Sequence, residues 1–284
     1  MDQIEYPALF HGSDEASNSF QRYYLWLVRA QYFLLIVAAV FAMASFSGQP
    51  AYRILNALIF FASIALLMAG AVFRPEQDWY KCRALAESVK TVTWRYMMRA
   101  APFDAADARE VFRQHLLELF KANRETAEKI AADWAAQVQL TSQMEAVRSK
   151  DLEARKSFYL EHRVHDQNSW YVAKAKANSR AGLYWACGAV SAYFLGALFV
   201  MLRSEYPDRE WPIEPVIVVA AAILGWIQVK KFGELTAAYK VTASEIGFLA
   251  PVIESAKDDA AMSAAVNDAE LAFSREHTLW LARQ

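Results

Sequence analysis

The chain lacks most features on which enzymes and disulfide-rich domains depend. It has two cysteines in 284 residues, and neither Cys82 nor Cys187 has a cysteine or histidine partner at metal-ligand spacing. His162 and His165 lie near Glu161, but no second cluster of ligands accompanies them. A P-loop, a dinucleotide-binding glycine pattern, an HExxH helix and a GxSxG elbow are all missing. We therefore expect free thiols, no metal, no cofactor and no enzymatic activity.

Acidic residues are missing from four long apolar stretches, and this is the strongest signal in the chain. The stretches run from about Tyr24 to Phe46, Ile54 to Phe73, Ala181 to Leu202 and Pro215 to Val229. One helical crossing of a bilayer needs about 20 apolar residues. The sequence therefore predicts an all-α membrane protein with four transmembrane helices.

Basic residues gather at one end of each pair of apolar stretches. Most of them lie between Arg74 and Arg180, and Lys230 and Lys231 follow the fourth stretch. The two short connections instead carry few basic residues, mixed in the second one with acidic residues. Because lysine and arginine near span ends remain in the cytoplasm, we expect cytoplasmic termini and a cytoplasmic middle segment.

The two halves of the chain share one order of segments: an N-terminal segment, two apolar stretches that form a hairpin, and a charged helical segment. Both hairpins are expected to start and end inside, so they form parallel repeats, unlike the inverted repeats of many transporters. We predict a first two-span repeat over 1–103, a cytoplasmic amphipathic helical segment over 104–150 and a second two-span repeat over 151–284. No glycine or proline occurs between Pro102 and Gly182, which predicts long helical extensions beyond the membrane.

Apolar residues in the middle segment recur mostly three or four positions apart. They are Phe112, Leu116, Leu119, Phe120, Ala127, Ile130, Trp134 and Val138. This spacing predicts an amphipathic stripe that packs on another helix of the chain or of its twin.

Small residues recur at four-residue steps inside the spans. They are Gly188, Ala192 and Gly196 in the third span and Ala221 and Gly225 in the fourth. Such residues let helix backbones approach closely in lipid. We predict that they pack spans together, within one chain or between subunits.

Strongly polar residues are rare in the spans. The exceptions, each near a span end, are Arg29, Gln31, Asn56 and Gln228. This scarcity argues against a proton relay or a charge-selective ring. Any pore should be poorly selective and lined by small, hydroxyl and apolar groups such as Ser63, Ser191 and Ala220.

Cationic and aromatic side chains follow the second span. They are Arg83, Lys90, Trp94, Arg95 and Arg99. Together they offer phosphate contacts and a stacking surface for a nucleotide signal, although contact with anionic lipid headgroups is the favoured interpretation. A formal net charge of −1 argues against a nucleic-acid partner.

Three blocks resemble a known family. The block before the third span contains Tyr159, Leu160, Arg163, Asp166, Gln167, Trp170, Tyr171, Lys174, Ala175 and Asn178. The block after the fourth span contains Ala238, Tyr239 and Glu245, followed near the end by VNDAELAFSREHTLWLAR. The block after the second span contains Arg83, Ala86, Glu87, Lys90, Trp94, Tyr96, Pro102 and Phe103. Together these blocks resemble a tandem pair of SLATT domains, the SMODS and SLOG-associating two-transmembrane effector domains of bacterial conflict systems.

The resemblance implies a multi-pass protein of the bacterial inner membrane that acts in antiviral defence. Such a protein would self-associate among membrane lipids and form pores or otherwise disrupt the membrane. Its trigger would be a sensor, or an enzyme encoded nearby that produces a nucleotide second messenger. A non-conducting anchor or scaffold for a sensor is the alternative, and a small transporter ranks third.

Two cytoplasmic helices offer complementary side chains. One carries Arg163, Gln167, Trp170, Tyr171 and Asn178, and the final helix carries Glu270, Glu276, His277, Trp280 and Arg283. Our hypothesis is that Arg163 pairs with Glu270 or Glu276 and that Trp170 packs on Trp280, which would build a cytoplasmic bundle. The alternative is a set of surface ion pairs that contribute little to stability.

Overall fold

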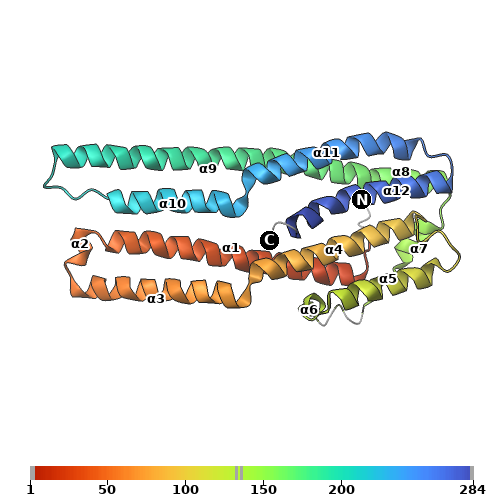
Figure 1. Ribbon diagram of the computed structural model, residues 1–284, viewed down its shortest axis with the longest axis horizontal. Coiled ribbons are helices and arrows are strands. Elements are labelled where there is room, and N and C mark those ends of the chain that lie inside the picture. The colour runs from red at the N-terminus through yellow and green to blue at the C-terminus, as the bar shows by residue number, and fades with distance from the viewer. Residues whose placement is uncertain (1–3, 132–133, 135–136, 282–284) are drawn as a thin grey trace. The chain divides into compact units, whose positions relative to one another are not determined.

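A computed structural model describes residues 4–131, 134 and 137–281, without the side chains of 47 and 275–281. Every regular element in this part of the chain is a helix (Figure 1). The first six are α1 (Ala8–Phe41), α2 (Ala44–Ser47), α3 (Pro50–Phe73), α4 (Pro75–Met97), α5 (Ala108–Ala122) and α6 (Arg124–Ala127). The others are α7 (Ser142–Arg148), α8 (Leu152–Tyr159), the π-helix η2 (Leu160–His165), α9 (Asp166–Glu205), α10 (Ile213–Lys230), α11 (Phe232–Glu254) and α12 (Asp259–Leu281). The predicted all-α fold is confirmed.

The chain divides into two compact units. We call Arg22–Pro75 with Ala175–Ala237 the span unit, because it contains the apolar parts of α1, α3, α9 and α10. We call Met1–Gln21, Glu76–Lys174 and Ala238–Gln284 the bundle unit. Each unit draws on both halves of the sequence.

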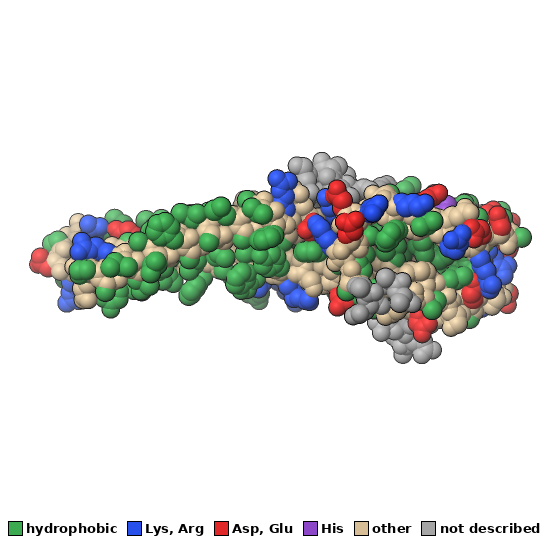
Figure 2. All heavy atoms as spheres, turned by 90° about the horizontal axis from the view of Figure 1, so that it is seen from below, with side chains coloured by type: hydrophobic (Ala, Val, Ile, Leu, Met, Phe, Trp, Pro, Cys, Tyr) green, Lys and Arg blue, Asp and Glu red, His purple; other side chains and the backbone are tan. Residues whose placement is uncertain are grey.

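Large apolar side chains cover the outside of the span unit (Figure 2). Examples are Phe61, Val72, Val190, Phe194 and Met201, all more than half exposed. In water such a surface would be unfavourable, whereas in a bilayer it faces lipid tails. Four helical stretches of the described chain are long and apolar enough to cross a membrane, as predicted.

Both α3 and α10 end in the same way. The residue after each helix, Arg74 or Lys231, has a positive φ of 44° or 48°. Its backbone N–H bonds to the carbonyl oxygen four residues earlier, and the next helix begins at once. A left-handed residue stops an α-helix and redirects the chain, so the apolar helix and its charged follower are separate elements in both halves.

The connections at the far ends of the two hairpins meet within the span unit. The backbone N–H and the hydroxyl of Ser45, in α2, both donate to Glu210 in the connection between α9 and α10. These bonds, led by the one from the hydroxyl, hold the pKa of Glu210 below its usual range. Phe41, Phe46 and Tyr52 pack together beside Ser45, with ring centroids 5.3–5.7 Å apart.

The bundle unit has an aromatic core. Phe112 and Leu116 of α5 join this core, together with Tyr96 and Phe103. The expected stripe does not continue as one helix to Val138, because α5 ends at Ala122. There Asn123 leaves helical geometry, and its side-chain amide donates to the carbonyl of Leu119 at 2.9 Å.

The absence of proline, with only Gly182, Gly188 and Gly196 as weak points, correctly predicted a long helix in the second half. Residues Leu152–Glu205 form one helical run of 54 residues, made of α8, η2 and α9. The six-residue π segment within it was not predicted, because composition alone does not distinguish π from α geometry.

Candidate functional site

A buried carboxylate lies at the centre of the bundle unit. Glu270 of α12 has no exposed surface. Arg163 donates to both of its oxygens, through Nε to Oε1 at 2.9 Å and through Nη2 to Oε2 at 2.7 Å. The Tyr159 hydroxyl donates to Oε1 at 2.9 Å, and Thr91 donates to Oε2 at 3.1 Å. A buried charge is tolerated only when it is paired and hydrogen-bonded, and Glu270 meets both conditions.

The π segment brings two of these donors to the same oxygen. Tyr159 is the last residue of α8, and Arg163 lies four residues later inside η2. A π turn inserts an additional residue into a helical run, so it changes which side chains share a face. Single π turns are frequent at functional sites, which makes this segment a candidate for a functional role.

Aromatic rings enclose the ion pair. The Arg163 guanidinium lies over the ring of Phe273, 4.5 Å from its centroid. Trp94 of α4 meets Tyr159 edge to face at 5.5 Å, and its indole N–H donates to the Tyr6 hydroxyl at 3.0 Å. The site therefore joins the segment before α1 to α4, α8, η2 and α12.

Burial shifts the acid–base behaviour of the groups around the pair. Desolvation raises the pKa of Tyr159 well above its usual value and that of Tyr6 to about 12. Burial alone would lower the pKa of Arg163, but Glu270 raises it above its ordinary value. Lys90 differs, because desolvation lowers its pKa to about 8, and Glu87 offsets this only in part. Arg163 therefore remains charged, whereas Lys90 titrates near physiological pH.

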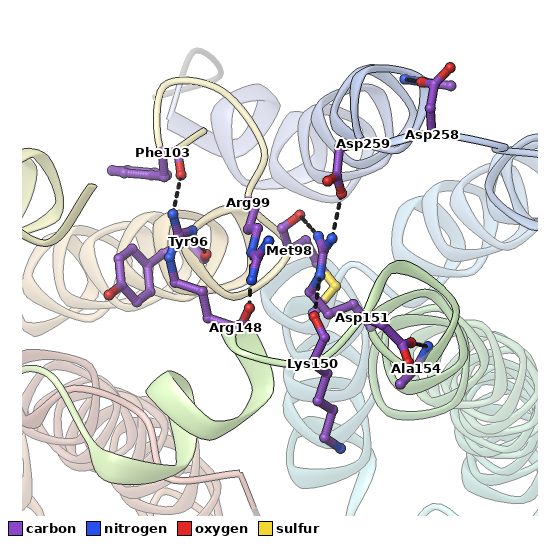
Figure 3. Close-up of polar contacts among 12 residues, drawn as sticks. Tyr96, Met98, Arg99, Phe103, Arg148, Lys150, Asp151, Ala154, Asp258 and Asp259 are labelled. Carbon is purple, nitrogen blue, oxygen red and sulfur yellow. Dashed lines mark hydrogen bonds and ion pairs between the residues drawn. The ribbon is translucent and has the colours of Figure 1, made fainter. Parts of the chain in front are cut away.

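A second cluster of arginines holds the end of α4 (Figure 3). Arg148 donates to the carbonyls of Tyr96 at 2.6 Å and Phe103 at 2.7 Å, and its guanidinium lies over the Tyr96 ring. Arg99 in turn donates to the carbonyl of Arg148 at 3.0 Å. The last carbonyls of a helix have no intrahelical partners, and cations satisfy them well.

Arg155 ties the two halves of the chain together within the bundle unit. Its buried guanidinium donates to the carbonyls of Met98 at 2.8 Å and Lys150 at 3.2 Å. The same group pairs with Asp259, the first residue of α12 (Figure 3). Sequence reasoning missed this residue, because its partners are mainly backbone carbonyls with no sequence signature.

The structure brings together some of the residues expected on the two cytoplasmic helices. Of the two alternatives for Arg163, its partner in the structure is Glu270. Trp170 and Tyr171 pack on Tyr239 of α11, with centroids 5.5 and 5.7 Å apart. Gln167 and Asn178 are partly buried along α9. The side chains of Glu276, His277 and Trp280, and the whole of Arg283, lie outside the described part of the chain.

The small residues of the third span face the fourth span of the same chain. A β-carbon at Gly188 would lie 3.8 Å from Ile223, and one at Gly196 would lie 3.6 Å from Val216. Ala192 is buried in the same unit, and a β-carbon at Gly225 would collide with Tyr32 of α1. In α10 Ala220 is buried, whereas Ala221 is exposed and makes no close packing within the chain.

The cationic set after the second span does not form one patch. Arg83 bonds to Asp14 at 3.1 Å and to Glu87 at 2.7 Å, while Arg99 takes part in the cluster at the end of α4. Trp94 has no exposed surface. Its assignment as a lipid or nucleotide contact is therefore wrong, because the ring belongs to the core and its N–H is used by Tyr6. Lys90 and Arg95 retain partial exposure.

The cysteines and the acidic groups form no obvious reactive centre in the described residues. No set of three or more histidine, cysteine, aspartate or glutamate side chains gathers there as a metal site would require. Cys82 and Cys187 are free. Burial raises the pKa of the Cys82 thiol to about 11, which keeps it protonated at neutral pH.

The fold and these contacts define a helical membrane protein with a charged bundle that contains a buried ion pair. Residues 7–156 match the family model of the SMODS and SLOG-associating 2TM effector domain 3, and residues 159–280 match that of domain 1. The chain belongs to this SLATT family, with two domains in tandem. Such domains are two-transmembrane effector domains of bacterial conflict systems. No curated protein and no solved structure matches the chain.

Polar contacts within the bundle unit join the two family matches. Thr91 and Arg155 belong to the first match, whereas Glu270 and Asp259 belong to the second. The hydrogen bond from Thr91 to Glu270 and the ion pair of Arg155 with Asp259 therefore hold the tandem domains together in one bundle.

Proposed function

We propose that this chain permeabilises the bacterial inner membrane when a sensor partner or a nucleotide signal activates it. The observation that carries the proposal is the pair of two-transmembrane effector domains over residues 7–280. Four apolar helices give the chain the means to act within the bilayer.

Self-association is part of the proposal. A single chain has only four spans, and in the span unit small residues pack these helices closely. A water-filled passage needs more helices around it, and closed rings are the simplest symmetric assemblies of identical chains. The exposed apolar surface of the span unit supports contacts with lipid and with further copies.

Activation is proposed to reach the membrane along one helical run. The π segment that carries Arg163 and the apolar third span both belong to Leu152–Glu205. A trigger that alters the pairing of Arg163 with Glu270 would also alter the start of this run. Because π turns interconvert with α geometry, the segment offers a physical place for such a change.

The test is membrane potential and dye entry in bacteria that express the chain from an inducible promoter, alone and with its neighbouring genes. We expect depolarisation in at least one setting. Gly188→Leu and Gly196→Leu should abolish it at unchanged membrane abundance, because each side chain would enter the contact between α9 and α10. Gly247→Leu is the matched control, since a β-carbon there meets nothing within 4 Å.

An unchanged potential in every setting, with the wild-type protein in the membrane, would contradict the proposal and favour the scaffold. Depolarisation that persists in both glycine variants would still support the effector function. That result would show that the helix contacts needed for permeabilisation are not those at Gly188 and Gly196.

A further inference from the structure

The interior of the first hairpin contains polar atoms that have no partner. Asn56 Oδ1 and Ser63 Oγ of α3, and Gln31 Oε1 of α1, are buried and accept or donate no hydrogen bond among the described residues. Ser63 is 5% exposed, and it is the only polar residue among the buried residues of the described span unit. The three atoms therefore stand out against apolar surroundings.

These polar residues share one face of α3. Asn56 and Ser63 are seven residues apart, which is close to two helical turns, and Gly70 follows after another seven. A β-carbon at Gly70 would meet nothing beyond its own helix within 4 Å, so there is open space beside this position. The opposite face carries Ile54, Phe61 and Val72, all more than half exposed.

The polar atoms occur at successive depths of the hairpin. Helix α1 ends at Phe41 and α3 begins at Pro50, on the two sides of a short turn (Figure 1). At 1.5 Å per residue, Asn56 lies about 9 Å from this turn, Gln31 about 15 Å, Ser63 about 20 Å and Gly70 about 30 Å. The hydrocarbon core of a bilayer is about 30 Å thick. The three polar atoms thus lie between about 9 and 20 Å from the turn, and Gly70 continues the same face to the other side of the apolar thickness.

The second hairpin has no such series. In the described part of the span unit, every buried polar side-chain atom without a partner comes from the first hairpin. The contact between α9 and α10 is instead made by glycine, alanine and aliphatic side chains, among them Gly188, Ala192 and Ala220. Small apolar residues favour a closed contact that excludes water.

An unpartnered polar group in an apolar interior is unfavourable until water or another polar group reaches it. A hairpin that always stayed closed would be more stable with apolar residues at these positions. The same groups would be satisfied in a state that admits water along this face. The arrangement therefore favours hydration of the first hairpin over that of the second.

We propose that the α3 face with Asn56, Ser63 and Gly70, together with Gln31 of α1, becomes the wetted wall of the conducting path. The inference rests on the proposed permeabilising function and names the surface that performs it. The permeating species are water and small ions of either sign, because no charged side chain is among the buried residues of the described span unit.

Cysteine accessibility tests the wall directly. In a Cys82→Ser, Cys187→Ser background, Asn56→Cys and Ser63→Cys are compared with Ile54→Cys and Phe61→Cys on the exposed, opposite side of the same helix. A charged, membrane-impermeant thiol reagent is added during depolarisation. We expect it to reduce ion flux about fivefold at the two wall positions and to leave flux at the two control positions unchanged.

A matched pair of substitutions tests the role of the hydroxyl. Ser63→Val and Ser63→Thr introduce side chains of similar volume, but only threonine keeps a polar oxygen at the wall. We expect flux through the valine variant to be about tenfold below that through the threonine variant, at equal membrane abundance. Equal flux through the two would overturn the inference.

The outcomes separate the inference from the function on which it rests. If the wild type depolarises cells but the reagent acts equally at wall and control positions, the path lies elsewhere and the effector function stands. If the wild type never depolarises cells, with or without its neighbouring genes, both proposals fail.

Discussion

The Glu270 carboxylate of the bundle unit and the polar groups inside the first hairpin differ in their hydrogen bonding, although Arg163 Nη1, Arg95 Nε and Asn267 Oδ1 of the bundle unit are also buried without a partner in the described chain. In the bundle, the Glu270 carboxylate receives hydrogen bonds from Arg163, Tyr159 and Thr91. In the hairpin, Asn56 and Ser63 have buried oxygens without partners in the described chain. A satisfied network specifies one arrangement of helices, whereas unsatisfied groups favour any state that hydrates them. The hydrogen bonds of Glu270 therefore favour one arrangement of the helices around it, whereas Asn56 and Ser63 favour a state that hydrates them.

Removing one member of the satisfied pair should have the largest effect. Arg163→Met leaves the Glu270 charge buried without its cation, and we expect a loss of about 3–5 kcal/mol in the free energy of unfolding. Thermal unfolding of the full chain in detergent, followed by circular dichroism, measures the change. The double variant with Glu270→Leu should recover most of this loss, because no buried charge remains.

Arg113→Met is the matched control for the arginine substitution. Arg113 pairs with Glu110 on the surface of α5 at 2.6 Å, with the two side chains 67% and 50% exposed. Such a pair contributes at most about 1 kcal/mol. Equal losses for the two arginine substitutions would show that burial of the Arg163 pair has no special importance.

Lys90 is a partly exposed cation whose surroundings disfavour its charged form. Burial lowers its pKa to about 8 from 10.5, with Arg163 and Arg83 acting in the same direction and Glu87 and Glu270 against it. Between these pH values the unfolded chain binds a proton that the folded chain does not bind, so stability rises with pH. We expect Lys90→Met to stabilise the protein by about 1–3 kcal/mol below pH 8, and this gain should vanish towards pH 10.5.

The pH series is measured by thermal unfolding between pH 7 and 10.5. Lys81→Met is the control on the same helix, because the Lys81 side chain is 47% exposed and pairs with an exposed Glu125. A gain at Lys90 that is independent of pH would indicate added apolar contact and not relief of a buried charge.

The smallest expected effects differ in sign between the two regions. Ser63→Ala removes an unpartnered hydroxyl, so we expect a gain of about 1 kcal/mol. Thr91→Val removes a hydrogen bond to Glu270 while keeping the shape of the side chain, so we expect a loss of about 1.5–3 kcal/mol. Both are read from the midpoint of thermal unfolding in detergent. Changes of the same sign would remove the distinction between the two interiors.

Much of the architecture could be predicted from local patterns. Four acid-free apolar runs predicted the four helices able to span a membrane, and the absence of proline, with only three glycines, predicted the run Leu152–Glu205. The end of α5 at Asn123 was not predicted, because one amide side chain competed with a periodic apolar pattern. The assignment of Trp94 to the membrane surface was wrong for a similar reason, since its spacing does not reveal the helices that bury it.

The candidate sites were only partly accessible to sequence reasoning. Arg163 and Glu270 stood out as complementary charges on two helices, and Glu276 was an equal alternative. Tyr159 and Thr91 were not expected as partners of Glu270, because a tyrosine and a threonine in a helix have many ordinary roles. In α10, Gly225 packs closely on Tyr32 of α1 while Ala221 is exposed in the single chain, a difference that four-residue spacing alone could not reveal.

The sequence by itself determined which segments are apolar enough for a membrane and which family the chain resembles. Those properties depend only on local composition and on the order of residues, and both can be read directly from the sequence. The tertiary structure alone decided which buried polar groups find partners, because a hydrogen bond depends on the meeting of residues far apart in the chain. Glu270 meets Thr91 across 179 positions, while Ser63 meets no partner in the described chain.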